Sequence, residues 1–300
     1  GDLRCVSSDI KAIGNTSNNY VEGTLNFGHL TAAGGTMYLE NTGSDEVLPL
    51  VQNAARLEEG AVIYCKKVSY VPWLQGDGVW YMSCSYDEAA DEITGAGVGN
   101  VIGNVVWNEH IRFFQPTILN IGSYADASLT IPEEMTVEIP NGCMIYNKGG
   151  SNGSYTGTLT NLGTLNVLDG GTLQNGLNDN IFTNKGTLHI QTGGKFFNTY
   201  DPNVKTGGTV QNQGHIKTDT GTMFQNQSLL ENSGIMDCAA GSFYNVLLPG
   251  YDAVINNTGT INGFVTEAKS TCYTYTTYGN TVLGTRQMLT LQSAANQVTG

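Results

Sequence analysis

The stretch "GTLTNLGTLNVLDGGTLQN", residues 157 to 175, returns at short intervals to an apolar residue, an Asn and a Gly. Its first unit, "LTNLGTLNV" at 159–167, follows the template apolar-x-Asn-x-Gly-x-apolar-x-small. The same template recurs as "FTNKGTLHI" (182–190), "VQNQGHIKT" (210–218), "LENSGIMDC" (230–238) and "INNTGTING" (255–263). Self-similarity at a period of roughly 24 residues is typical of repeat architectures.

This period predicts a parallel β-solenoid. The units start 23, 28, 20 and 25 residues apart, and a shorter apolar-x-Asn motif recurs between them, so we expect two short strands per repeat. Each coil of a solenoid pairs with its neighbours through the backbone, about 4.8 Å away. We expect Gly to provide positive φ at the corners and the Asn amide to bond the same residue of the next coil.

Alternation along the template assigns its faces, because successive side chains of a strand point to opposite sides. Two columns are expected to point inward, namely Leu165, Leu188, Ile216, Met236 and Ile261, and Val167, Ile190, Thr218, Cys238 and Gly263. The outward column between them consists of Asn166, His189, Lys217, Asp237 and Asn262. All five outward residues are polar, so this column is the candidate ligand-binding face.

Composition supports an all-β protein with many tight turns. Of the 300 residues, 40% are hydrophobic and 13% are charged, and 39 are Gly, which argues against disorder and against a helical fold. The formal net charge of -13 would repel phosphate backbones, so nucleic acid is not an expected partner. No apolar run approaches about 18 residues, so no membrane insertion is expected.

The solenoid has a lead-in and a sequence resemblance. Residues 128–149, "SLTIPEEMTVEIPNGCMIYNKG", alternate apolar and polar side chains and run into the repeat. The phrases "LTIPEE", "NLGTL" and "GGTLQN" resemble those of bacterial cell-surface adhesin-like proteins with repetitive solenoids. The resemblance implies a right-handed parallel β-helix, here placed at 118–268, in a secreted or cell-surface, non-enzymatic adhesin or stalk.

Residues 20–99 have another pattern, with alternating strands of five to seven residues between turn signals, which predicts a β-sandwich. This segment resembles the immunoglobulin-like domains of the ASPM/SPD-2/hydin kind at Phe27 and Gly28, Asn41 to Gly43, Leu57 to Gly60, Val68 to Pro72, and Gly95 to Gly97. The resemblance implies an Ig-like β-sandwich at 1–99 and supplies no catalytic residue. Residues 100–117 would form a linker, and 269–300 a C-terminal β cap or the start of a further module.

The six cysteines form no CxxC pair and have no metal-ligand spacing with the four histidines, so neither a metal nor a cofactor is expected. Cys65 and Cys84 lie on two expected neighbouring strands; a disulfide between them is left open, with free thiols favoured. Cys143 and Cys238 share the inward parity and are expected to be buried free thiols.

Parallel β-helices also include polysaccharide-active enzymes, so a lyase or glycoside hydrolase is the alternative function. No arginine occurs between residues 112 and 286, and that span has no Asp-Asp or Asp-x-Asp pair. His189, His215, Lys217 and Asp237 could cluster on adjacent coils for acid-base chemistry, but a solvated face of mixed charge is the favoured interpretation. No catalytic residue is assigned.

One aromatic residue joins the candidate binding set. Trp73 follows Pro72 at an expected turn and is a surface candidate for stacking on a sugar, whereas Trp80 alternates with Met82 and Cys84 as a core residue would. The expected partner is an extracellular glycan or a host surface protein. The chain is expected to act as a monomer and to contact this partner through a side face of the coil or its loops.

Overall fold

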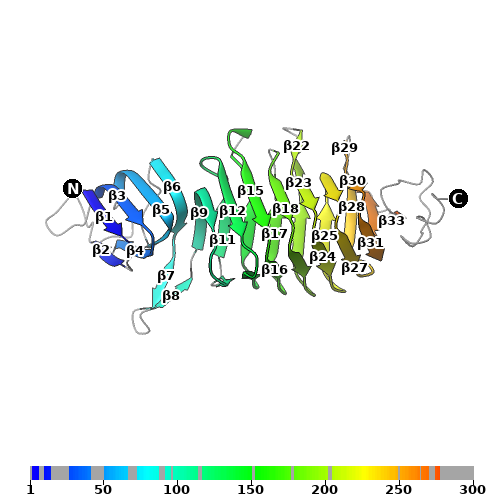
Figure 1. Cartoon of the computed structure of the whole chain (residues 1–300), viewed down its shortest axis with the longest axis horizontal. Coiled ribbons are helices and arrows are strands. Elements are labelled where there is room, and N and C mark those ends of the chain that lie inside the picture. The colour runs from blue at the N-terminus through cyan, green and yellow to red at the C-terminus, as the bar shows by residue number, and fades with distance from the viewer. Residues whose placement is uncertain are drawn as a thin grey trace.

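The chain is all-β in a computed structural model that describes residues 2–6, 10–14, 27–41, 51–66, 73–87, 92–95, 97–113, 117–150, 153–176, 179–201, 205–248, 251–263, 265–269 and 274–277. Figure 1 shows strands stacked in coils along one long axis, from β1 (Asp2–Val6) at one end to β31 (Thr260–Gly263) near the other. The largest part is a parallel β-solenoid, as the repeat predicts.

Each coil of the solenoid contributes a strand to each of three faces. The first face consists of β11 (Thr117–Ile121), β14 (Met144–Asn147), β17 (Thr172–Asn175), β20 (Lys195–Asn198), β25 (Met223–Asn226) and β28 (Phe243–Leu248). The second face consists of β12 (Ala127–Ile131), β15 (Gly157–Asn161), β18 (Ile181–Asn184), β23 (Thr209–Asn212), β26 (Leu229–Asn232) and β30 (Val254–Asn257).

The third face consists of β10 (Ile111–Arg112), β13 (Thr136–Ile139), β16 (Thr164–Val167), β19 (Thr187–Ile190), β24 (His215–Thr218), β27 (Ile235–Cys238) and β31. The expectation of two strands per repeat is therefore wrong. The nine-residue template covers a second-face strand, a corner and a third-face strand, while the shorter motif "LQN" is a separate first-face strand. Two-residue and four-residue corners leave room for all three.

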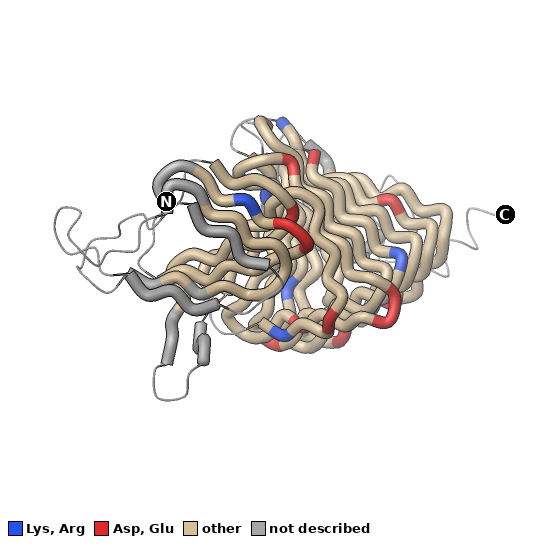
Figure 2. The backbone as a smooth tube through the Cα atoms, turned by 60° about the vertical axis from the view of Figure 1, so that its left-hand side comes forward, with Lys and Arg blue, Asp and Glu red and all other residues tan. Residues whose placement is uncertain are grey.

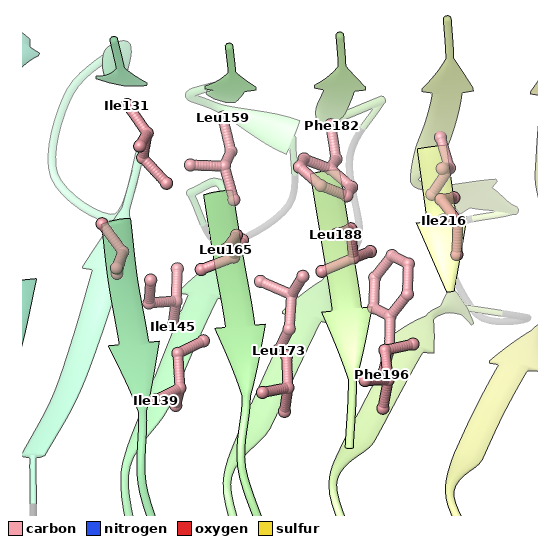
Figure 3. Close-up of a cluster of buried hydrophobic side chains, with 14 of the residues drawn as sticks. Ile131, Ile139, Ile145, Leu159, Leu165, Leu173, Phe182, Leu188, Phe196 and Ile216 are labelled. Carbon is pink, nitrogen blue, oxygen red and sulfur yellow. The ribbon is translucent and has the colours of Figure 1, made fainter. Parts of the chain in front are cut away.

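Pairing within each face is parallel and in register, which stacks equivalent residues. Leu165 pairs with Leu188, and Leu188 pairs with Ile216, and all three are completely buried. Figure 3 shows these side chains pointing into the core that the three faces enclose. The two predicted inward columns are confirmed except at Gly263, which is exposed. Its φ of 98° suits a glycine that ends the last third-face strand.

Aromatic rings fill the core of the later coils. Phe196 stacks on Phe224 at a ring-centroid distance of 4.6 Å, and Phe224 stacks on Phe243 at 4.4 Å. Phe182, from the second face, meets Phe196 edge-on at 5.6 Å. The four rings are completely buried, so they form a continuous apolar column along the axis.

Two ladders of asparagines, all buried except the half-buried Asn257, run along the first-face and second-face strands. In the first, each side-chain amide donates to the Oδ1 of the next, at 2.7 to 2.9 Å, through Asn147, Asn175, Asn198, Asn226 and Asn245. In the second, the distances are 2.6 to 2.8 Å, through Asn161, Asn184, Asn212, Asn232 and Asn257. The predicted inter-coil Asn bonds are confirmed.

The asparagine amides also hold the corners. The Nδ2 group of Asn184 donates to the carbonyl of His215 at 3.1 Å as well as to Asn212, and Asn212 likewise donates to the carbonyl of Ile235 at 3.0 Å. The carbonyl bonded in this way belongs to the strand that follows the corner of the next coil. The amides of Asn184 and Asn212 thus each use two donors and one acceptor inside the protein.

Both ladders have a defined first member. Asn147 stacks on Ile121 and Asn161 stacks on Ile131 of the preceding coil, and neither isoleucine side chain can donate a hydrogen bond. The Oδ1 atoms of Asn147 and Asn161 are accordingly buried without a partner. All amides donate toward the C-terminal end, so each ladder has a direction.

The template glycines serve close approach rather than positive φ. A Cβ added at Gly186 would lie 2.0 Å from the carbonyl oxygen of Gly163, the equivalent glycine in the corner of the preceding coil. Positive φ occurs instead at the corner between the third and first faces, for example 79° at Gly193. The expectation that the Asn-Gly corner needs positive φ is wrong, because that corner turns with ordinary backbone and needs the absent side chain.

The N-terminal strands form parallel pairs rather than the antiparallel sheets of an immunoglobulin-like sandwich. Strand β1 pairs in parallel with β3 (Phe27–Ala33), and β2 (Ile10–Gly14) pairs in parallel with β4 (Thr36–Asn41). Both β3 and β4 pair in parallel with the long strand β5 (Val51–Lys66), which pairs in parallel with β6 (Trp73–Met82). The structure therefore does not confirm the Ig-like domain at 1–99.

The strands β1 to β6, which we call the N-terminal stack, join the solenoid through an antiparallel pairing. Strand β6 runs antiparallel to β9 (Gly97–Val106), and β9 in turn pairs in parallel with β11 and β12. The hairpin of β7 (Ser85–Asp87) and β8 (Glu92–Gly95) lies in the connection and projects from the stack in Figure 1. Strand direction thus reverses at β9, and the expected linker at 100–117 contains most of β9 and the whole of β10.

Three short antiparallel strand pairs accompany the later coils in the part of the chain that the structure describes. These are β21 (Tyr200–Asp201) with β22 (Thr206–Gly207), β29 (Tyr251–Asp252) against β28, and β33 (Thr274–Thr277) against β32 (Val265–Lys269). Strand β32 itself continues the first face in parallel with β28. The expected C-terminal cap at 269–300 falls mostly outside the described residues.

We expect Leu188→Ala to lower the free energy of unfolding by about 2 to 5 kcal/mol, because it opens a cavity in a fully packed column. His189→Ala, one residue along on the outward side, should cost about 1 kcal/mol or less. Urea melts of both variants measure the contrast. A larger loss for His189→Ala would mean that the strand is shifted by one residue, since such a slip exchanges its faces.

We expect Asn212→Ala to cost at least about 2 kcal/mol, because it orphans buried groups that each lose about 1 to 3 kcal/mol. Asn212 donates to Asn232 and Ile235 and accepts from Asn184. The matched control, Asn166→Ala, removes an outward amide and should cost about 0.5 kcal/mol or less. Equal denaturation midpoints for the two variants would contradict a stabilising role for the ladder.

Candidate functional site

The predicted outward column lies on the third face. Asn166 pairs with His189, His189 with Lys217, Lys217 with Asp237, and Asp237 with Asn262, each on the neighbouring coil. Lys217 and Asn262 are exposed, and the other three are half-buried. The structure therefore brings all five predicted residues into one straight row, which we call the third-face column.

Hydrogen bonds join the C-terminal half of the column. The Nε2 atom of His215 lies 2.6 Å from Oδ2 of Asp237, and the Asn262 amide donates to Oδ1 of Asp237 at 2.8 Å. The bond from Asn262 is the main cause of a pKa of the Asp237 carboxyl below its usual value. Partial burial opposes this shift, while His215 and Lys217 add to it. Asp237 is thus an ionised acceptor at neutral pH.

A second acidic residue, Asp219, completes the charge pattern. Its Oδ2 lies 3.0 Å from Nε2 of His189, and its Oδ1 lies 4.0 Å from Nζ of Lys217. The His189 contact is close enough for an ion pair but lacks hydrogen-bond geometry, so the buried Nε2 makes no hydrogen bond. Sequence reasoning missed Asp219, although it continues the outward parity of Lys217 two residues along.

Trp73 does not join the third-face column. It begins β6 in the N-terminal stack, where 66% of its surface is exposed, while the column runs from β16 to β31. Its predicted exposure is confirmed. Trp80 is completely buried, as its alternation indicates. Any ligand of Trp73 would therefore occupy a separate part of the surface.

The first face carries a row that sequence reasoning missed. Tyr146, Gln174, Phe197, Gln225 and Tyr244 stack in register on successive coils, and all are half-buried. Aromatic and amide side chains therefore alternate along the axis. Burial, with a smaller effect of the Asp201 charge, raises the pKa of Tyr146, so its hydroxyl stays protonated. The sequence signal that could have found this row is the apolar-x-Asn motif, because its middle residue lies between two inward residues and therefore faces outward.

The second face is polar and shallowly hollowed. Thr183, Gln211 and Glu231 form a hydrogen-bonded row at 3.2 Å per step. A depression of about 280 Å³ lies over Gln211, Glu231 and Asn256. Among the described residues, no group of three or more His, Cys, Asp or Glu side chains is placed to hold a metal ion. The chemistry of the side faces is therefore hydrogen bonding and ion pairing.

The cysteines are inward residues. Cys65, Cys84, Cys143 and Cys238 are buried free thiols, so the disulfide left open between Cys65 and Cys84 is not formed. Burial, with a smaller contribution from the Asp237 charge, raises the pKa of Cys238 to about 12. Burial also raises the pKa of Cys143, against hydrogen bonds from Thr117. Cys272 lies outside the described residues.

Comparison of the chain with known protein families, curated proteins and solved structures gave no match. In the part of the chain that the structure describes, no helix is long and apolar enough to cross a membrane. Function must therefore be argued from the surfaces themselves.

We expect Cys143 and Cys238 to resist a thiol reagent at pH 8 in the native protein, because only the thiolate reacts and burial suppresses it. An introduced cysteine at the exposed corner residue Ser233, in Ser233→Cys, should react rapidly and provides the control. Mass spectrometry of labelled peptides reads out both. Native labelling of Cys238 as fast as the introduced cysteine would show that the column does not face inward.

Proposed function

We propose that the chain is a non-enzymatic, secreted or cell-surface adhesin or stalk whose third face binds an extended extracellular glycan. The observation that carries this proposal is the third-face column, a straight row of hydrogen-bonding side chains on successive coils. Its members repeat at the strand spacing of about 4.8 Å. An extended polymer that lies along the solenoid axis would meet the same kind of contact at each coil.

The chemistry of the column suits neutral sugar hydroxyls. Asn166 and Asn262 offer both donors and acceptors, Lys217 donates, and the ionised Asp237 accepts. Charge-assisted hydrogen bonds of this type are stronger than neutral ones. A hydroxyl group both donates and accepts, so it can satisfy any member of the column.

Charge favours a neutral polymer over an acidic one. The chain carries a formal net charge of -13, which repels polyanions at long range. Figure 2 shows Lys, Arg, Asp and Glu residues of both signs at separate places along the described solenoid. Trp73, exposed in the N-terminal stack, would add a separate stacking surface.

One contact favours the second candidate, a polysaccharide-active enzyme. The His215–Asp237 pair, at 2.6 Å, has the form of an imidazole oriented by a carboxylate, which general acid-base catalysis uses. Both side chains are about two-fifths exposed, at 38% and 43%. Such exposure suits binding better, because catalytic charges act more strongly where they are shielded from bulk water.

A glycan and host-protein array tests the proposal. We expect the native chain to bind neutral polysaccharides, and the double variant Asn166→Ala, Lys217→Ala to bind them at least about tenfold more weakly, as loss of about 1.4 kcal/mol implies. Gln211→Ala, an outward amide on the second face, is the control and should bind normally.

Two results would contradict the proposal. Binding only to host proteins on the array would replace the glycan by a protein partner. Release of shortened or unsaturated products from a bound polysaccharide, abolished in Asp237→Asn, would establish the enzyme instead.

A further inference from the structure

A cavity lies where the N-terminal stack meets the solenoid. Its volume is about 330 Å³, and its walls come from β5, β6 and the segment at 107–113. The third face begins there with β10, a strand of two residues, which pairs with β13. At this end of the third face, the core is therefore covered by the segment 107–113, of which only the two residues of β10 form a strand.

The inner wall of the cavity is aromatic and fixed. Tyr64 and Tyr81 lie parallel, with ring centroids 4.8 Å apart and an interplanar angle of 8°. Trp107 meets Phe113 edge-on at 5.8 Å. Trp107, Phe113 and Tyr81 are each less than a tenth exposed, so packing holds the rings in place without a ligand.

The two tyrosines leave hydrogen-bonding capacity unused. Neither phenol hydroxyl is hydrogen-bonded to a residue that the structure describes, and neither is among its buried polar atoms without a partner. Burial, with a smaller effect of Cys84, raises the pKa of Tyr64 to about 12, and burial raises that of Tyr81 as well. Both hydroxyls therefore remain protonated and able to donate.

The rim of the cavity is polar. The Thr136 backbone N–H donates to Nδ1 of His110 at 3.0 Å, so the neutral imidazole carries its proton on Nε2 and can donate it outward. Glu109 is exposed and accepts, while Arg112 is exposed and donates, 3.7 Å from Glu138. Donors and an acceptor thus surround the opening of an aromatic cavity.

We infer that this cavity binds a pyranose ring at the end of a glycan chain. The apolar face of the sugar would pack on the aromatic wall, and its hydroxyl edge would meet the two phenols and the rim residues Glu109, His110 and Arg112. A wholly apolar ligand would leave these polar groups unpaired, which is costly. A volume of about 330 Å³ is at the small end of ligand pockets and fits one or two sugar rings.

This inference rests on the proposed function only in taking a glycan as the ligand, because the cavity and the third-face column are separate sites. The cavity would hold a chain end, whereas the column would hold the length of a polymer. Free monosaccharides therefore test the cavity, and polymers test the column.

The experiment uses the full chain and a panel of neutral methyl pyranosides, with binding followed by saturation-transfer NMR and titration calorimetry. We expect at least one pyranoside to bind, with saturation transfer from aromatic protons. Tyr64→Phe keeps the ring and removes one hydroxyl, and Glu109→Gln removes the negative charge of Glu109 from the rim. Each variant should bind at least about tenfold more weakly. Tyr244→Phe removes a first-face hydroxyl, which is bonded to the Gly241 carbonyl at 2.7 Å, and should not change binding.

Thermal melts establish that Tyr64→Phe and Glu109→Gln remain folded. Absence of binding by every pyranoside at millimolar concentration would overturn the inference, while polymer binding on the array would leave the proposed function intact. Binding that neither cavity variant weakens would also overturn it. Loss confined to the cavity variants, with no polymer effect in the third-face variant, would support the cavity and contradict the column.

Discussion

Backbone hydrogen bonds between successive coils set the constraint on which the rest of the structure depends. They hold each strand about 4.8 Å from its counterpart in the next coil and in strict register. A side chain therefore meets the same position of the next coil, and each column must be compatible with itself. Three kinds of residue satisfy this in the interior, namely aliphatic and aromatic side chains, asparagines that bond each other, and glycines such as Gly186 where no Cβ fits.

Self-compatibility explains how much of the fold could be predicted. The Asn-Gly corner repeats at every coil, so the second-face and third-face strands and the inward column of Leu188 follow from the sequence. Most first-face strands lack that glycine, and the first face was not recognised as a third strand of the coil. In the N-terminal stack, the alternation of apolar and polar residues predicted strands but not how they pair, because parallel and antiparallel strands share a period of two. The direction of β3 to β6 is decided by tertiary pairing, which a single sequence does not encode locally.

The candidate sites divide in the same way. The third-face column was predictable because its five residues occupy one position of a repeat. Asp219 lies just beyond the template, and the first-face row of Tyr146 belongs to the strand that was not recognised. The cavity joins residues near Tyr64 and Tyr81 to the segment 107–113, and the antiparallel pairing of β6 with β9 is what brings them together. No periodic pattern marks a site that arises where the period is interrupted.

The direction of the asparagine ladders bears on how such a protein changes its length. A coil with an asparagine at both corners accepts from the coil before it and donates to the coil after it, wherever it is placed within the ladder. Among the described residues, Asn147 and Asn161 begin the two ladders, so tandem duplication or loss of a coil within a ladder creates no new orphaned amide. Reach can then grow or shrink by about 4.8 Å per coil. Repeat copy number sets the length of the solenoid, and it can evolve independently of the chemistry that the outer faces present.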